Sequence, residues 1–235
     1  MQTGISIVTP CTVNCDDKTP YKVVYLLHGL SDNHTCWMSN TQLTLMAEEY
    51  NVVFICPEVQ RSYYADMVYG LPYFTYIAEE LPKICQKLFQ ISSKREDTYV
   101  MGLSMGGYGA LKCGLTKPEQ YIGCGAFSSA CIPELLIGGG SLSAEESHGI
   151  CGDELLVSPE SNLFRLAENC QSNPMKPHIY MSCGTEDWLL EGNRQFREHI
   201  DALGYDLTYQ EWEGNHNWYF WNESLRRALQ LFLQK

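Results

Sequence analysis

The chain has 235 residues, a length that one α/β domain often reaches, so the sequence predicts a single domain spanning residues 1–235. Its 16 basic and 28 acidic residues give a net charge of −12, which argues against a nucleic-acid partner and against docking on anionic lipid, because both need a basic face. With 45% hydrophobic and 19% charged residues, the chain has the composition of a globular domain that buries a sizeable core.

Apolar runs that predict strands alternate with helical patterns along the chain. The predicted strands are, in order, 21–27, 51–56, 98–103, 121–129, 178–183 and 207–212. Apolar residues at helical spacing predict helices in 43–50, 74–88, 105–115, 193–203 and 221–232. Pro82 is expected to kink or restart the second helix, and Gly204 to end the fourth. This alternation predicts an α/β fold with a mostly parallel sheet covered by helices on both faces.

The segment 131–177 departs from this alternation. It contains the triple glycine 138–140, four prolines and little periodicity. Long irregular segments in compact domains often serve as lids or binding loops. We therefore expect a short, irregular, cap-like insertion at this place in the domain.

The sequence predicts neither a secretory nor a membrane-spanning segment. Residues 1–4 lack the basic and apolar regions of a signal peptide, and apolar runs such as 23–27 fall far short of the roughly 20 residues that span a bilayer. The 11 cysteines are odd in number and scattered, with no Cys-x-x-Cys pair and no zinc-finger spacing. We therefore expect most of them to be reduced core thiols of a cytoplasmic protein that holds no metal.

A candidate nucleophile, Ser104, lies in Gly102-Leu103-Ser104-Met105-Gly106, which fits the pattern G-x-S-x-G. The bare pattern is expected by chance in roughly one chain in ten of this length and composition. Its context is more specific, because it follows a predicted strand and precedes a predicted helix, as a nucleophile elbow does. Glycines on both sides permit the tight turn. The alternative is a glycine-rich β–α turn with an incidental serine.

A serine nucleophile needs a base, and His216 is the predicted one. In proteins that carry a nucleophile elbow of this kind, the acid and then the histidine come after the serine along the chain. Two histidines come after the strand at 178–183. His199 falls inside a predicted helix. His216 lies in a polar loop between the last strand and the last helix, where this fold places its base.

The predicted acid is Asp187, in the loop that follows the strand at 178–183. A carboxylate there can reach the histidine and fix its tautomer. Glu186, one residue earlier, is the competing candidate.

Two backbone N–H groups are predicted to form an oxyanion hole. One belongs to Met105, the residue after the nucleophile, and the other to Leu30, in the loop after the strand at 21–27. His28, just before that loop, is expected to be a structural imidazole and not the base.

Several blocks of the sequence closely resemble the esterase D group of α/β-hydrolases, which includes S-formylglutathione hydrolases, mycolyltransferases and bacterial tributyrin esterases. The blocks are Leu26–Leu30 with Asn33 and Trp37, Tyr64–Asp66, Tyr69–Gly70 and Gly102–Ala110. Ala78–Pro82 and Ser93–Glu96 are most similar to the tributyrin esterases and the related feruloyl and acetyl esterases. The resemblance implies an α/β-hydrolase fold and a serine carboxylesterase with Ser104, Asp187 and His216 as its triad.

The resemblance also shows two departures. The chain begins within the family's second strand, at 5–9, which implies a sheet edge that is free for contacts in a homo-oligomer. The segment 135–156 matches poorly, and it is where acyl and alcohol specificity would lie.

The predicted reaction is hydrolysis of short-chain acyl esters through an acyl-enzyme, with a small-molecule ester as the partner and no cofactor. Because the base must be neutral, activity should rise as the pH passes roughly 6 to 7. An acyltransferase and a catalytically silent binding module with this fold are the alternatives from other classes.

Aromatic side chains are predicted to form the rim of the site. They are Trp37, Tyr63, Tyr64, Tyr69, Trp188 and Trp218. Such a rim suits an apolar or phenolic acyl group, so a feruloyl or cinnamoyl esterase is the second interpretation. An S-formylglutathione hydrolase-like thioesterase is the third, because the glutathione carboxylates would find few cations beyond Arg61 and Arg165.

Overall fold

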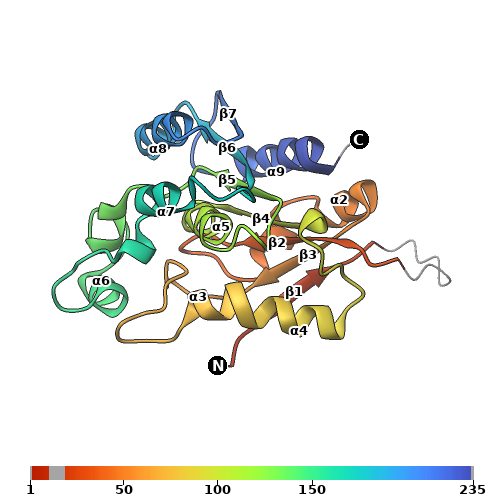
Figure 1. Cartoon of the computed structure of the whole chain (residues 1–235), viewed down its shortest axis with the longest axis horizontal. Helices are drawn as coiled ribbons and strands as arrows, with labels where there is room; N and C mark the ends of the chain where they lie inside the picture. The colour runs from red at the N-terminus through yellow and green to blue at the C-terminus, as the bar shows by residue number, and fades with distance from the viewer. Residues whose placement is uncertain (1, 11–18, 234–235) are drawn as a thin grey trace.

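A seven-stranded sheet forms the centre of the protein in a computed structural model that describes residues 2–10 and 19–233 (Figure 1). The strands are β1 (Ile5–Val8), β2 (Lys22–Leu27), β3 (Val52–Pro57), β4 (Thr98–Leu103), β5 (Gly123–Phe127), β6 (His178–Gly184) and β7 (Leu207–Trp212). They stand in the order β1-β3-β2-β4-β5-β6-β7. Every neighbouring pair is parallel except β1 and β3, which are antiparallel at one edge. The prediction of a mostly parallel sheet is therefore confirmed.

Helices cover both faces of the sheet, as predicted. They are α1 (Cys36–Asn40), α2 (Leu43–Tyr50), α3 (Tyr73–Thr75), the π-helix η1 (Tyr76–Glu80), α4 (Leu81–Leu88), η2 (Arg95–Asp97), α5 (Met105–Thr116), η3 (Pro133–Ile137), α6 (Ala144–Cys151), η4 (Pro159–Ser161), α7 (Leu163–Cys170), α8 (Leu190–Ala202) and α9 (Trp218–Leu233). One core cluster joins the sheet to α4, α5, α7 and α8, and the other joins it to α1, α2 and α9. No helix in the described ranges is both long and apolar enough to cross a membrane.

The central strands are buried on both faces, which explains their continuous apolar runs. Every residue of β3, β4 and β5 is buried. A parallel strand between two helical layers has no solvent-facing side, so its sequence does not alternate. Such strands leave the polar chemistry to the loops at their ends.

The segment 131–177 is more regular than its sequence suggests. The expectation of an irregular insertion is wrong for α7, whose buried residues Leu163, Leu166, Ala167 and Cys170 have the spacing of one helix face. This helix packs on α5 and belongs to the layer that covers the sheet. The part that extends beyond the sheet holds η3 and α6, which lie to one side of it in Figure 1.

Helix boundaries follow the predicted signals. Pro82 lies in the first turn of α4, directly after the π-helix, so the predicted helix restarts there. Gly204 has a φ of +69° just beyond α8, the left-handed conformation that ends many helices.

The nine cysteines in the described ranges are free thiols, and most of them are buried. This agrees with the prediction of reduced core residues. Cys11 and Cys15 lie outside the described residues.

Candidate active site

Ser104 occupies a sharp turn between β4 and α5. Its backbone has φ 52° and ψ −117°, in the left-handed region that a non-glycine residue rarely adopts. The two motif glycines are required by close approach, since a Cβ on Gly106 would overlap the carbonyl oxygen of Leu27, and one on Gly102 would overlap the carbonyl oxygen of Gly106. The turn is therefore strained and tightly packed, which holds the hydroxyl at the carboxyl edge of the sheet.

The three residues predicted as a triad form one hydrogen-bonded chain. His216 Nε2 lies 3.0 Å from Ser104 Oγ. On the other side of the ring, His216 Nδ1 lies 2.9 Å and 3.1 Å from the two carboxylate oxygens of Asp187. The residues come from loops after three different strands, β4, β6 and β7. With Nδ1 protonated and held by the carboxylate, Nε2 is free to accept the proton of the serine hydroxyl.

Asp187 is buried and ionised. Burial opposes the charge, but the hydrogen bond from His216 and the backbone N–H of Leu189, 2.9 Å from Oδ1, outweigh it and lower the pKa of the Asp187 carboxyl below its ordinary value. The competitor Glu186 is exposed. Of the two candidates, the structure therefore brings Asp187 to the histidine.

The predicted oxyanion donors lie on the loops expected of them. Met105 is the first residue of α5, where N–H groups have no partner within the helix, and Leu30 lines the same cavity as Ser104. Neither N–H makes a backbone hydrogen bond within residues 2–10 and 19–233.

His28 lies beneath the oxyanion loop, away from the serine. It is almost fully buried, and its Nδ1 donates to the carbonyl of Gly29 at 2.7 Å, while its Nε2 accepts the N–H of Val59 at 3.1 Å. These bonds tie the loop after β2 to the loop after β3. The structure thus agrees with the expectation of a structural imidazole.

A cavity of about 240 Å³ opens above Ser104 and His216. Its lining includes Gly29, Leu30, Ser31, Asp32, Arg61, Tyr63, Leu103, Ala130, Ser141, Trp188 and Trp221. The Trp188 and Trp221 rings contact the His216 ring, with centroids 5.6 Å and 4.9 Å away. The histidine ring therefore packs against two indoles, which limit its rotation.

Trp37 is a correction to the predicted rim, because it is fully buried. Its Nε1 donates to the carbonyl of Leu27 at 3.0 Å and its ring packs against Phe127, so it supports the sheet and does not touch substrate. A tryptophan whose N–H finds a backbone acceptor fits the core well.

Two further rim candidates lie beside the cavity and not in its wall. Tyr69 is exposed, and its hydroxyl donates to Asp153 at 3.0 Å. Trp218 packs edge-on against Trp221 at 5.3 Å and lines a neighbouring surface hollow. Of the six predicted rim aromatics, Tyr63 and Trp188 line the cavity, whereas Tyr64 is fully buried.

Arg61 and Glu146 form a contact to the cap that sequence reasoning missed. The Arg61 guanidinium is hydrogen-bonded to the Glu146 carboxylate of α6, and it donates to the carbonyl of Ser141 at 2.8 Å. The partners lie 80 and 85 positions apart, so no local signal in the sequence could pair them. The pair fixes the cap segment over the loop after β3.

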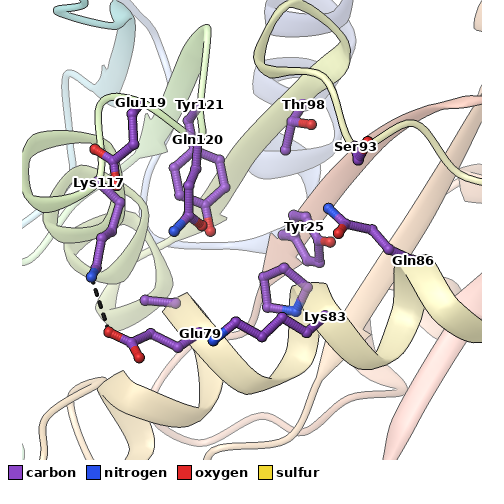
Figure 2. Close-up of a pocket in the computed structure, with 12 residues that line it drawn as sticks. Tyr25, Glu79, Lys83, Gln86, Ser93, Thr98, Lys117, Glu119, Gln120 and Tyr121 are labelled. Carbon is purple, nitrogen blue, oxygen red and sulfur yellow. Dashed lines mark hydrogen bonds and ion pairs between the residues drawn. The ribbon is translucent and has the colours of Figure 1, made fainter.

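A second hollow, of about 420 Å³, lies at the opposite end of the sheet (Figure 2). Its wall is formed by α4 and the loop before β5, and Thr98 at the start of β4 contributes to it. Figure 2 shows Lys117 paired with Glu79 across this hollow, at 3.0 Å. No residue of the hydrogen-bonded chain described above lines it.

Comparisons with known proteins identify relatives of this chain. Residues 2–232 match the family described as "Putative esterase". An acetyl esterase of Caldicellulosiruptor saccharolyticus is 32% identical over 223 residues, 91% of this chain and 84% of that protein. Fluorophosphonate-binding serine hydrolase F of Staphylococcus aureus superposes with a TM-score of 0.92 at 26% identity, covering 100% of this chain and 94% of that one. The S-formylglutathione hydrolase of Staphylococcus aureus superposes with a TM-score of 0.89 at 26% identity and the same coverage. These similarities confirm the α/β-hydrolase fold.

Proposed function

The chain belongs to the Esterase family and is a carboxylesterase, and on that premise we propose that it hydrolyses short-chain acyl esters with Ser104, His216 and Asp187 as its triad. The observation that carries this proposal is the unbroken hydrogen-bond chain from the Ser104 hydroxyl through His216 to the buried Asp187 carboxylate. The resemblance to the acetyl esterase supports the choice of a small acyl group.

The reaction proceeds in two acyl-transfer steps. Ser104 Oγ attacks the ester carbonyl while His216 Nε2 takes its proton, and Asp187 stabilises the imidazolium. The N–H groups of Leu30 and Met105 hold the oxyanion of the tetrahedral intermediate. His216 then gives the proton to the leaving alkoxide, so an alcohol departs and an acyl-serine remains. Water repeats the sequence, releasing the carboxylic acid and restoring the serine.

The size and charge of the cavity favour a small, neutral acyl ester. A volume of about 240 Å³ is below the range usual for drug-sized ligands. Arg61, the guanidinium in the lining, is already paired with Glu146, while Arg165 pairs with Glu168 on the exposed face of α7. Neither arginine is free to receive the carboxylates of a glutathione thioester. We therefore expect a lower kcat/KM for that thioester than for a simple acetate ester.

A feruloyl or cinnamoyl ester is the second candidate, because Trp188, Trp221 and Tyr63 give the cavity an aromatic wall. Values of kcat/KM for p-nitrophenyl acetate, methyl ferulate and S-formylglutathione separate the three substrate classes. We expect the order acetate, ferulate, thioester. A clear preference for the thioester would reject the first choice, and product partition with added alcohols would reveal an acyltransferase.

Labelling with a fluorophosphonate tests the nucleophile. We expect one covalent adduct, located on Ser104 by peptide mass spectrometry and absent from Ser104→Ala. Ser104→Ala should also lose about 10⁶-fold in kcat, whereas the control Ser93→Ala, in the hollow at the other end of the sheet, should keep wild-type activity. An unlabelled, inactive wild-type protein would support the silent binding module instead.

A further inference from the structure

Lys112, on α5, is a buried amine that the proposed reaction does not use. Its side chain is 3% exposed. The ammonium donates to the carbonyl of Tyr64 at 3.2 Å and to Ser161 Oγ at 3.4 Å. It also lies over the Phe74 ring, 4.6 Å from the centroid. The partners of this cation are thus a carbonyl, a hydroxyl and a ring face, and not a carboxylate.

Such a placement is costly for a lysine. Burial lowers the pKa of Lys112 to about 8, because a charge surrounded by apolar side chains loses its hydration. A leucine or methionine would fill this space without that cost. The stability of the fold therefore does not explain an amine at this position. The hydrogen bonds that the Lys112 ammonium makes offer another explanation.

The carbonyl that Lys112 holds belongs to a strained turn. Tyr63 and Tyr64 have φ values of 50° and 49°, two consecutive side chains in the left-handed region. Such a conformation persists only where the surroundings over-determine it. Here α5 supplies two constraints, since Lys112 binds the Tyr64 carbonyl and Gly109, lacking a side chain, makes room for the Tyr64 ring.

This turn contacts the active site at two places. Tyr63 lines the cavity above Ser104. The Tyr64 hydroxyl donates to the carbonyl of His28 at 2.9 Å, directly before the loop that carries the Leu30 N–H. A shift of the turn therefore moves a wall of the cavity and one of the two proposed oxyanion donors together.

We propose that Lys112 is a positioning residue: on the helix that begins directly after Ser104, it holds the Tyr63–Tyr64 turn and so sets the position of the oxyanion loop relative to Ser104. The inference rests on the proposed function. Lys112 touches no substrate and acts through Tyr64 and His28. Its second bond, to Ser161, ties the cap segment to the same point, where the Tyr108 hydroxyl also donates to the Ser161 carbonyl at 2.7 Å.

A double-mutant cycle tests the proposal. Lys112→Met removes the hydrogen bond to the turn, and Tyr64→Phe removes the bond from the turn to the oxyanion loop. For p-nitrophenyl acetate we expect each variant to lose about tenfold in kcat with less than a threefold change in KM, because a displaced oxyanion donor weakens the transition state selectively. The double variant should also lose about tenfold, and not a hundredfold, because both changes break one linkage.

The matched control is Lys117→Met. Lys117 is the residue that follows α5, but its ammonium pairs with Glu79 at the other end of the sheet (Figure 2), so kcat should stay at the wild-type value. Melting temperatures within a few degrees of wild type would show that the Lys112→Met and Tyr64→Phe losses do not come from unfolding.

Three outcomes would overturn the proposal: wild-type kcat in Lys112→Met, wild-type kcat in Tyr64→Phe, or a double variant whose loss is the product of the single losses. If Lys112→Met does not fold, Tyr64→Phe alone decides. Labelling of Ser104 by the fluorophosphonate separates the two hypotheses, because an unlabelled wild type refutes the triad, whereas a labelled wild type with unaffected variants refutes Lys112 alone.

Discussion

The two ends of the sheet differ in how their polar groups are used. The larger hollow, about 420 Å³, lies at the amino ends of the strands, and the smaller cavity, about 240 Å³, at the carboxyl ends. At the carboxyl end Ser104, Ser128, Tyr63 and Tyr64 hold left-handed backbone conformations in loops after three strands. At the amino end, the hydroxyls of Tyr25 and Tyr121 have no hydrogen-bond partner among the described residues. Left-handed backbone is thus concentrated at the carboxyl end, against Asn51 just before β3 at the amino end, and volume does not mark the end proposed to carry the chemistry.

The strongest test of that difference is removal of the buried charge at the carboxyl end. Asp187→Asn keeps the shape of the side chain but favours the wrong tautomer of His216. We expect kcat for p-nitrophenyl acetate to fall about 10⁴-fold. Because the pKa of the Asp187 carboxyl lies below its ordinary value, the carboxylate is ionised at both pH 6 and pH 8, so a large loss is expected at both.

The neighbouring carboxylate provides the control. Glu186→Gln changes an exposed side chain and should alter kcat less than twofold. A large loss in Glu186→Gln together with a small one in Asp187→Asn would reverse the choice of acid.

The sequence predicted the carboxyl-end loops well because their signals are local. The strand 98–103, Ser104 and the following helix lie within one continuous segment. Asp187 follows the apolar run 178–183, and His216 follows the predicted strand 207–212. Parallel strands bring their carboxyl ends to one edge, so three distant loops are predicted to meet. The structure places these side chains in contact, while their catalytic roles remain predictions.

Local sequence signals could not predict which side chains are buried and which line the cavity. Trp37 and Trp188 look alike in the sequence, yet Trp37 is fully buried against the central strands, whereas Trp188 is part of the cavity wall. Trp221 has the helical spacing of a core residue and also contacts His216. Lys112 has the charge of a surface residue but is buried. Each depends on neighbours far away in the chain, which single-sequence periodicity does not report.

The packing of the nucleophile turn gives the second prediction. Gly106→Ala places a methyl group against the backbone carbonyls of Leu27 and His28, which cannot rotate away. We expect the free energy of unfolding to fall by about 3 kcal/mol, measured by urea denaturation. In Gly140→Ala the close contact is with the flexible end of the Leu135 side chain, at 3.0 Å, while the Leu135 carbonyl lies at an ordinary 3.6 Å, so the change should cost less than about 1 kcal/mol. Equal losses would mean that the turn is no more constrained than the cap.

Acid pH gives the third prediction, through Glu58 beneath the oxyanion loop. Burial would raise the pKa of this carboxyl, but the backbone N–H groups of Gln60 and His34 donate to it at 2.7 Å and 3.1 Å and lower the pKa well below its ordinary value of 4.5. Because the folded pKa is the lower one, the stabilisation is complete above about pH 4.5 and is lost as the pH falls toward 2.

Urea denaturation between pH 6 and pH 2.5 measures this contribution. The wild type should lose about 2 kcal/mol more than Glu58→Gln over that interval. Parallel pH curves for the two proteins would show that the Glu58 carboxylate is not held as the structure indicates.

The smallest expected effect lies at the amino end and tests the other half of the comparison. Tyr121 is fully buried, its ring meets Tyr25 edge-on at 6.3 Å, and its hydroxyl has no partner among the described residues. Tyr121→Phe keeps the ring contact and removes a polar group that was desolvated without compensation. The free energy of unfolding should therefore rise by up to about 1 kcal/mol, with kcat/KM unchanged.

The control is Tyr180→Phe, which removes a hydroxyl that donates to Gln210 at 3.0 Å. Here we expect the free energy of unfolding to fall by about 1 kcal/mol instead. If Tyr121→Phe is destabilised like the control, the Tyr121 hydroxyl must bind a group from outside the chain. The hollow in Figure 2 would then be an occupied polar site.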